Sequence, residues 1–291
     1  MKPAPFSYHA PTTVGEAVSL LGDLGDEARV LAGGQSLIPL MNFRLAQPAH
    51  LVDVNPVSEL DYVRNDDGWL SVGARTRLSA AEASREVAER APLLLEALHM
   101  VAHPPIRHRG TVGGSMAHAD PAAELPVVAL AMDGEMVVGS SRGTRAVAAA
   151  DFFKGPFSTD LDAGELLTEC RFQTWPGEGT GSAFLEFTRT HGNFAVVGAA
   201  ALVHLEGERI DRAAVALCGV GGRPVRAALA EQGLLGQVPT TELVAAAAES
   251  AAAGLEPASD VHGSGDFRRK LARVYVGRAL ALAIARARGG R

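Results

Sequence analysis

A pair of glycines, Gly33 and Gly34, directly follows a short apolar run in the stretch LAGGQSLIPLMNFRLAQPAHLVDV (residues 31–54). The run at residues 28–32 predicts a buried strand, and the apolar residues after Ser36 predict a short helix. Because glycine has no Cβ, the N–H groups of such a turn can converge on one point and a ligand can approach closely. A turn of this kind near a helix start favours an anion, since the helix dipole is positive there.

A second turn of the same type lies in the stretch IRHRGTVGGSMAHADPAAELP (residues 106–126). Gly113 and Gly114 are flanked there by the hydroxyl residues Thr111 and Ser115. A single Gly-Gly pair most often only turns the chain. Two pairs, each followed by a hydroxyl residue and an apolar helix start, indicate a cradle for a bulky anion such as a diphosphate. The GxGxxG spacing of a Rossmann-type dinucleotide site follows no predicted strand in this sequence.

The pattern around these turns predicts an α+β protein with two domains. A Pro- and Gly-rich stretch at residues 175–182 is the best candidate boundary, and it divides the chain into residues 1–177 and a smaller α+β unit at residues 178–291. Helices are predicted at residues 13–21, 79–101, 121–132, 225–233, 241–253 and 267–285, and strands at 28–32, 51–54, 62–72 (two, joined at 66–68), 136–138, 166–172, 184–188, 195–204 and 213–218. Thr13 and Asp120 are the predicted N-caps of the first and third helices.

Composition and charge narrow the function. The chain has 291 residues, 47% of them hydrophobic and 21% charged, and a formal net charge of -6, which does not favour nucleic acid or an anionic membrane as a partner. No run approaches the roughly 18 apolar residues of a membrane span, and no signal pattern is apparent, so a cytoplasmic protein is expected. The two cysteines, Cys170 and Cys218, cannot supply the four thiolates that a [2Fe-2S] cluster usually takes. Any such cluster must therefore lie on another chain.

Both glycine-containing stretches resemble the FAD-binding medium subunit of the xanthine dehydrogenase and aerobic carbon monoxide dehydrogenase family. Three further stretches share the resemblance: FLEFTRTHGNFAVVGAA (184–200), ALCGVGGRPVRA (216–227) and FRRKLARVYVGRAL (267–280). The resemblance implies a two-domain flavoprotein, with an N-terminal FAD-binding domain of the vanillyl-alcohol oxidase and p-cresol methylhydroxylase type. It also implies noncovalent FAD, and a complex with a large molybdopterin subunit and a small subunit that carries two [2Fe-2S] clusters, expected as a dimer of heterotrimers.

In such a complex the substrate is oxidised at molybdenum, and FAD passes the electrons from the clusters to an external acceptor. Carbon monoxide, purines, N-heterocycles and aldehydes all remain compatible substrates, and quinone, NAD, dioxygen and a carrier protein compatible acceptors. No catalytic residue is expected in this chain. The cofactor-binding residues that the motifs and the resemblance imply are Ala32, Gly33, Gly34, Gln35, Ser36, Leu37, Thr111, Val112, Gly113, Gly114, Ser115, His118, Asp120, Glu124, Leu161 and Phe194. Glu186 departs from the family, because many relatives have a lysine a few residues before the arginine that matches Arg189.

Other interpretations of these residues are weaker. His103, His108, His118 and Asp120 could suggest a metal site, but neighbouring prolines and the missing HExxH spacing argue against one. Asp120 and Glu124 could form an acid–base pair, although capping and cofactor contacts explain them more simply. The basic residues of the last helix form either a solvated face or a contact with a partner subunit: Arg268, Arg269, Lys270, Arg273 and Arg278.

Two other functions also stay open. One is a free-standing flavin oxidase that acts on its own substrate, and the other is an interaction module that kept the fold without the cofactor.

Overall fold

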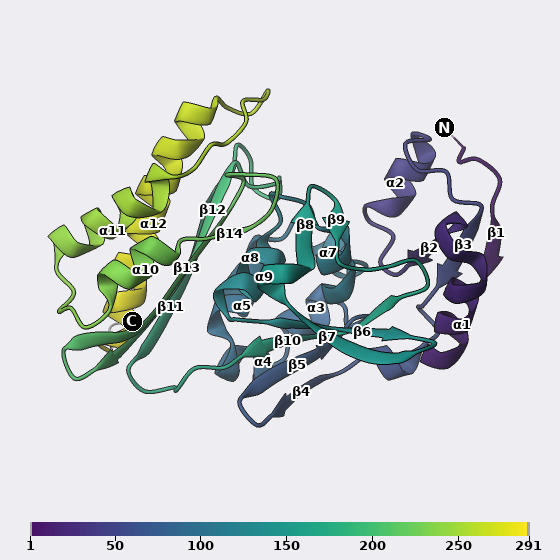
Figure 1. Ribbon diagram of the computed structural model, residues 1–291, viewed down its shortest axis with the longest axis horizontal. Coiled ribbons are helices and arrows are strands. Elements are labelled where there is room, and N and C mark those ends of the chain that lie inside the picture. Colours follow the sequence, from purple (N-terminus) through teal and green to yellow (C-terminus); the bar gives the residue numbers. More distant parts are fainter. Residues whose placement is uncertain (1, 290–291) are drawn as a thin grey trace.

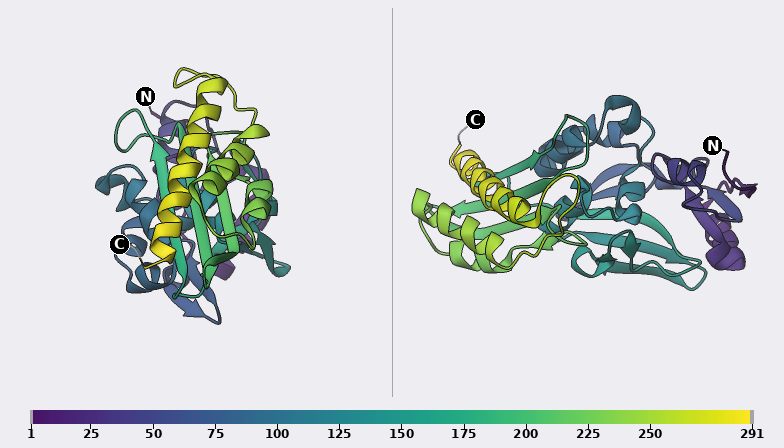
Figure 2. Two further views of the ribbon diagram at one scale, coloured as in Figure 1. Left: turned by 90° about the vertical axis from the view of Figure 1, so that its left-hand side faces the viewer. Right: turned by 90° about the horizontal axis from the view of Figure 1, so that it is seen from above.

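The protein is elongated, with three parts in a row along its long axis (Figures 1 and 2). The structure, a computed structural model, describes residues 2–289. The N-terminal part lies at one end, a mixed helix and sheet part in the middle, and the C-terminal sheet with its helices at the other end. None of the helices within residues 2–289 combines the length and apolar character needed to cross a bilayer.

The N-terminal part is a small parallel sheet of order β1-β3-β2 with a helix on it. Its elements are β1 (Ser7–His9), α1 (Val14–Leu24), β2 (Ala28–Leu31), α2 (Leu37–Asn42) and β3 (His50–Asp53). Helix α1 begins as predicted, because the Thr13 hydroxyl accepts a hydrogen bond from the Glu16 N–H at 3.1 Å. Ala17, Val18 and Leu21 of α1 are buried against the sheet, which fixes where β2 ends and the first glycine turn begins.

The middle part is built on an antiparallel sheet of order β4-β5-β10-β6-β7. Its strands are β4 (Val63–Asp66), β5 (Trp69–Gly73), β6 (Glu135–Ser140), β7 (Gly143–Ala148) and β10 (Leu166–Gln173). The predicted hairpin is confirmed, since Asp67 and Gly68 both have positive φ between β4 and β5. Strand β7 was not predicted, because only one of its residues, Val147, is buried and the alternation is weak.

Short helices cover this sheet, and two sequence predictions are corrected there. The helix predicted at residues 79–101 is instead three helices: α3 (Leu78–Glu82), α4 (Arg85–Arg90) and α5 (Pro92–Met100). Ser84 caps α4, and Ala91, which precedes a proline, leaves the helical region with ψ 60°. The other elements of this part are α6 (Pro104–Arg107), α7 (Val112–His118), α8 (Glu124–Ala131), α9 (Ala149–Phe152), β8 (Phe153–Gly155) and β9 (Ser158–Thr159).

Asp120 is not the N-cap that the sequence predicted. Helix α8 begins at Glu124, and the Asp120 carboxylate accepts a hydrogen bond from the Ala122 N–H at 2.8 Å in a turn that precedes the helix. The local bond to its own backbone competes with capping, as is typical of aspartate.

The C-terminal part is an antiparallel sheet of order β11-β12-β13-β14 with three helices on one face (Figure 1). Its elements are β11 (Thr180–Phe187), β12 (Val197–Glu206), β13 (Arg209–Cys218), β14 (Val225–Arg226), α10 (Ala228–Leu234), α11 (Thr241–Ala253) and α12 (Gly265–Ala287). The predicted helix at residues 225–233 is wrong at its start, since the first two residues pair with β13.

Both faces of the C-terminal sheet are buried, which joins it to the middle part. Along β12, Ala199, Ala201 and Val203 pack with α10–α12, whereas Ala200 and Leu202 belong to the core of the middle part. This alternation is what a strand with period two produces when each face has its own cover. One apolar core therefore runs across the predicted linker, and the division at residue 177 stays a prediction.

Of the basic residues of α12, Arg268 is structural, whereas Lys270, Arg273 and Arg278 are exposed as a solvated face requires, and a contact with a partner subunit stays a prediction. The Arg268 side chain is only 7% exposed and donates to the Val196 and Gly219 carbonyls and to the Asp260 carboxylate. Arg269 bonds to the Leu255 carbonyl, and Arg273 pairs with Glu249. Their partners lie within this chain.

Candidate functional site

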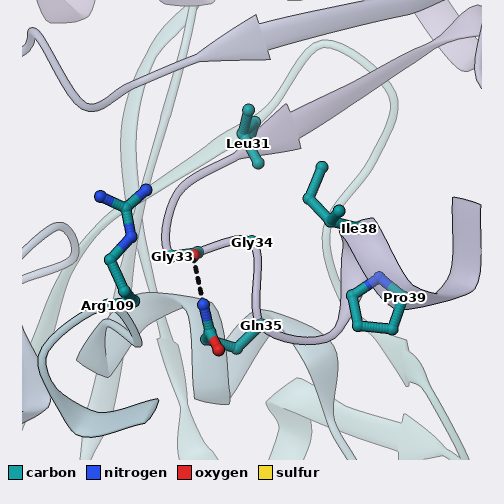
Figure 3. A pocket seen from close by; sticks show the side chains of 7 residues that line it. All are labelled: Leu31, Gly33, Gly34, Gln35, Ile38, Pro39 and Arg109. Atoms are coloured by element: carbon teal, nitrogen blue, oxygen red, sulfur yellow. Dashed lines mark hydrogen bonds between the residues drawn. The ribbon is translucent and has the colours of Figure 1, made fainter. Parts of the chain in front are cut away.

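The first glycine turn, residues 32–36, connects β2 to α2 and presents free hydrogen-bond donors. Within residues 2–289, the N–H groups of Gly33, Gly34, Gln35 and Ser36 donate to no protein acceptor. Gly34 has φ +73°, a conformation that glycine adopts without strain. The Gln35 side-chain amide donates to the Gly33 carbonyl at 3.3 Å and steadies the turn (Figure 3). Unpaired backbone donors of this kind require an external partner, either water or a ligand.

The second turn is built differently from the open turn that the sequence predicted. Thr111 is the N-cap of α7, and Gly113 and Gly114 lie in its first helical turn. The Gly113 N–H donates to the Ala74 carbonyl at 2.9 Å, and the Gly114 N–H to the Thr111 hydroxyl at 3.1 Å. The predicted nest of free N–H groups is therefore wrong here. The Ser115 hydroxyl, which has no partner within the described residues, is the group of this turn that remains available to a ligand.

The two turns lie against each other. A Cβ built on Gly33 would be 2.6 Å from the Arg109 carbonyl oxygen and 2.8 Å from the Gly110 Cα, so only glycine permits this approach. A cavity of about 470 Å³ borders the first turn and is lined by Leu31, Gly33, Gly34, Gln35, Ile38, Pro39 and Arg109 (Figure 3). The structure thus brings the two predicted turns together, and their shared role in binding a ligand stays a prediction.

The region carries an excess of positive charge beside this cavity. Arg75 and Arg77 are held by neighbours: Arg75 pairs with Asp61, and Arg77 donates to Asn55 and to the Arg109 carbonyl. Burial lowers the pKa of Arg77, and the charges of Arg109 and Arg75 lower it further. The charges of three arginines thus act on one another beside the cavity, and an added anion would offset that repulsion.

At the far end of α7, the predicted residue His118 meets an aromatic side chain that the sequence did not single out. The His118 ring lies 5.1 Å from the ring of Phe157, and the Phe157 N–H donates to the Ala119 carbonyl at 3.0 Å. Phe157 has φ +54° and its side chain is 61% exposed. A bulky residue with positive φ is an uncommon, strained conformation that clusters at functional sites. Burial lowers the pKa of His118, which keeps the ring neutral near pH 7.

Two acidic residues, the buried Glu124 and the half-buried Glu186, lie close enough where α8 meets the C-terminal sheet for one charge to act on the other. Burial raises the pKa of Glu124 to about 7. Burial also raises the pKa of Glu186, to about 8, with a smaller contribution from the charge of Glu124. One Glu186 oxygen has no hydrogen-bond partner within the described residues. The thiol of Cys218 lies beside Glu186 across Gly198, and its pKa is raised by burial and by both carboxyls.

The remaining predicted residues are spread over other loops. Leu161 follows β9 and packs against the core of the middle part. Phe194 lies in the β11–β12 loop with its side chain 61% exposed. His103 and His108 do not gather with His118: the ring of His103 lies 5.8 Å from His191, and His108 bonds to Ser79.

Two residues near the site were missed by the sequence interpretation. Arg109 lies immediately before the second turn in the quoted stretch, so its place in the motif was visible, but its free side chain was not. Phe157 precedes the STDL segment that contains Leu161, and only its backbone conformation distinguishes it from an ordinary loop aromatic.

Comparison with known families accounts for nearly the whole chain. Residues 4–174 match the model described as the FAD binding domain in molybdopterin dehydrogenase. Residues 182–283 match the CO dehydrogenase flavoprotein C-terminal domain. The expected two-domain FAD-binding fold of the α+β class is confirmed by these matches together with the solved structures below.

Individual relatives are similar over their full length. The chain is 42% identical to the 6-hydroxypseudooxynicotine dehydrogenase complex subunit alpha of Paenarthrobacter nicotinovorans, covering 99% of this chain and 97% of that one. It is 40% identical to the carbon monoxide dehydrogenase medium chain of Hydrogenophaga pseudoflava, covering 98% and 99%.

Solved structures give the same result. A carbon monoxide dehydrogenase structure from Hydrogenophaga pseudoflava superposes with a TM-score of 0.96 at 41% identity, covering 98% of this chain and 99% of that one. Quinoline 2-oxidoreductase from Pseudomonas putida 86 gives 0.93 at 42%, covering 99% of both chains. The chain therefore belongs to the family of FAD-binding subunits of molybdopterin dehydrogenases, which includes the medium chains of carbon monoxide dehydrogenases.

Proposed function

We propose that this chain holds FAD noncovalently on the turns at residues 32–37 and 111–115. The observation that carries the proposal is the set of four N–H donors of the first turn, which have no acceptor within residues 2–289; three of these residues, Gly33, Gly34 and Gln35, line the cavity. A diphosphate fits this donor set because its oxygens accept several hydrogen bonds at once. When bound, FAD supplies the capacity to take up electrons from iron–sulfur clusters and to release them to an external acceptor.

We further propose roles for the other predicted residues. Ser115 offers a hydroxyl to the diphosphate from the start of α7. His118, Leu161 and Phe194 contact the cofactor beyond it, with His118 held neutral by burial. Burial raises the pKa of Glu124 to about 7, and in its protonated form its carboxyl can donate a hydrogen bond to a cofactor oxygen.

The turn assignment is testable by hydrogen exchange on the purified chain with and without FAD. The free N–H groups of Gly33 to Ser36 should exchange rapidly in the FAD-free chain and become protected when FAD binds. The N–H groups of Gly113 and Gly114 should change little, because they are bonded within the protein in either state. Binding of FAD without protection of residues 33–36 would refute the assignment. Residues 207–208, in the exposed turn of the β12–β13 hairpin, serve as an internal control, because their exchange should not change when FAD binds.

We propose that the chain works in the cytoplasm, in a dimer of heterotrimers with a large molybdopterin subunit and a small subunit that carries two [2Fe-2S] clusters. Its relatives belong to complexes named for substrates as different as a nicotine derivative, carbon monoxide and caffeine. Because their identities to this chain, 42%, 40% and 40%, are nearly equal, the similarity does not select one of these substrates. Co-expression with the neighbouring subunit genes followed by native mass measurement tests the stoichiometry, and two copies of each of three chains are expected.

Anaerobic mixing of the isolated FAD-loaded chain with substrates of those classes distinguishes this function from a free-standing oxidase. No bleaching of the flavin absorption is expected without the partner chains. Direct bleaching would contradict the proposal.

A further inference from the structure

Arg109 lies in the second quoted stretch, but the proposed contacts of the two turns give its side chain no role. The Arg109 carbonyl oxygen accepts a hydrogen bond from the Arg77 guanidinium and packs against Gly33, so the backbone of Arg109 is fixed. Its side chain is exposed and, within residues 2–289, makes no hydrogen bond or ion pair. In Figure 3 this side chain runs alongside the backbone that leads from β2 into the first turn.

The other arginines near the cavity already have partners within the protein, so among the described residues there Arg109 is the one whose guanidinium is available to bind an anion. Arg75 is bound to Asp61 and to the Asn55 carbonyl, and Arg77 is bound to Asn55 and the Arg109 carbonyl. Asp53, the nearest acidic residue on β3, accepts hydrogen bonds from Tyr8 and Asn55. The residues that line the cavity include no carboxylate that could neutralise Arg109.

A diphosphate carries two negative charges at neutral pH, and the N–H donors of the first turn are neutral. Hydrogen bonds from neutral donors leave that charge uncompensated, whereas a guanidinium can donate two parallel bonds and neutralise part of it. We propose that Arg109 is the ionic partner of the FAD diphosphate. Its guanidinium, which is carried by the segment just before the second turn, would bind the diphosphate that the first turn holds. This inference rests on the proposed cradle and adds to it a residue that supplies charge.

The test compares Arg109→Gln and Arg109→Lys with the wild-type full-length chain after removal of FAD. Dissociation constants for FAD and for riboflavin, which lacks phosphate, are measured by flavin fluorescence at several NaCl concentrations. Arg109→Gln should weaken FAD about 10-fold, as expected for the loss of a hydrogen bond to a charged group, and should reduce the dependence on salt. Riboflavin affinity should not change. Arg109→Lys should fall between, since it keeps the charge and loses the paired geometry.

Arg90→Gln is the matched control, because Arg90 is an exposed arginine of α4 with no side-chain hydrogen bond or ion pair within the described residues. Thermal unfolding should be the same for all variants, since the Arg109 side chain has no protein partner to lose. An unchanged FAD affinity in Arg109→Gln would overturn the inference, as would an equal loss for FAD and riboflavin or a loss that does not depend on salt.

The outcome is separable from that of the cradle. If FAD protects residues 33–36 but Arg109→Gln keeps the wild-type affinity for FAD, the proposed cradle is supported and the role of Arg109 is refuted. If Arg109→Gln binds FAD more weakly but FAD does not protect residues 33–36, the role of Arg109 is supported and the role of the first turn is refuted.

Discussion

At the scale of single residues, Gly33 determines whether the two turns can touch. The first turn could form with another residue at this position, but its contact with residues 109 and 110 could not, because the Cβ would meet backbone atoms that cannot rotate away. The glycine pair was visible in the sequence as a flexible turn. Its steric role against Arg109 was not, since it depends on a segment far along the chain.

Gly33→Ala should therefore separate the turns and lower FAD retention. The added methyl group would lie 2.6 Å from the Arg109 carbonyl oxygen. Flavin-to-protein ratio after purification and the thermal midpoint measure the two effects, and both should decrease. Gly15→Ala in α1 is the control, because its Cβ has nothing within 4 Å and alanine favours a helix by about 1 kcal/mol. Full FAD content in Gly33→Ala would contradict the steric argument.

The Glu124 and Glu186 carboxyls should make stability fall as pH rises. Their pKa values in the folded chain, about 7 and about 8, are above the ordinary value of 4.5, so the unfolded chain loses these protons first. Between pH 4.5 and 8 the folded state binds more protons, and the free energy of unfolding falls with pH across that window. The charge of Asp120 also raises the pKa of Glu124.

Urea unfolding of wild type and Glu186→Gln at pH 5.5 and 8.5 measures this effect. The wild type should lose about 1–3 kcal/mol more than the variant between the two pH values, because the amide cannot ionise. Glu208→Gln, at an exposed position in the β12–β13 turn, should behave as wild type. Equal pH dependence in wild type and Glu186→Gln would show that Glu186 does not titrate in this range.

At the scale of elements, local signals located most helices and strands but not all of their ends. The cap at Thr13 and the period of residues 241–253 predicted α1 and α11 well, because those signals act within one or two turns. The long helix at residues 79–101 failed, because Ser84 and Pro92 interrupt a pattern whose apolar spacing continues across both breaks. The prediction of free N–H groups at the second glycine turn was also wrong. Gly113 packs against Ala74, a residue distant in sequence, and lies in the first turn of α7.

Helix α12 is held in place by one buried arginine rather than by its exposed charges. Arg268→Ala should lower the free energy of unfolding by about 3–5 kcal/mol, because the Val196 and Gly219 carbonyls and Asp260 lose their shared donor in a buried place. Arg273→Ala, on the same helix, should cost about 0–1 kcal/mol, since its pair with Glu249 is half exposed. Chemical denaturation compares the two, and similar losses would contradict the structural role of Arg268.

At the scale of the whole molecule, the middle and C-terminal parts share one apolar core. Phe184, Ala200, Leu202 and Ala216 of the C-terminal sheet pack into the core that contains α5 and α8. Arg286 of α12 reinforces this contact through Glu96 of α5 at 2.8 Å. Two family models meet between residues 174 and 182, yet the packing continues across that boundary.

Unfolding of these two parts should therefore occur together. Calorimetry of the full chain should show one unfolding transition for both parts. Leu202→Ala should lower the free energy of unfolding by about 2–5 kcal/mol, because the smaller side chain leaves a cavity in the shared core. Residues 1–177 expressed alone should bind a hydrophobic dye, because the face that covers their core is missing. Two well-separated transitions in the full chain would show that the parts are independent.

The sequence by itself determined the features that act over a few residues or by composition. It determined the paired glycines, the alternation of the strands, the helix cap at Thr13 and, through two cysteines, the need for another chain to hold iron–sulfur clusters. Only the tertiary structure decided that Gly33 lies on Arg109, that the first turn keeps its donors free while the second uses them, and that Glu124 and Glu186 lie close enough for one charge to act on the other. The physical reason is that free donors, unpaired charges and raised pKa values depend on which distant segments exclude water, and no local pattern encodes that.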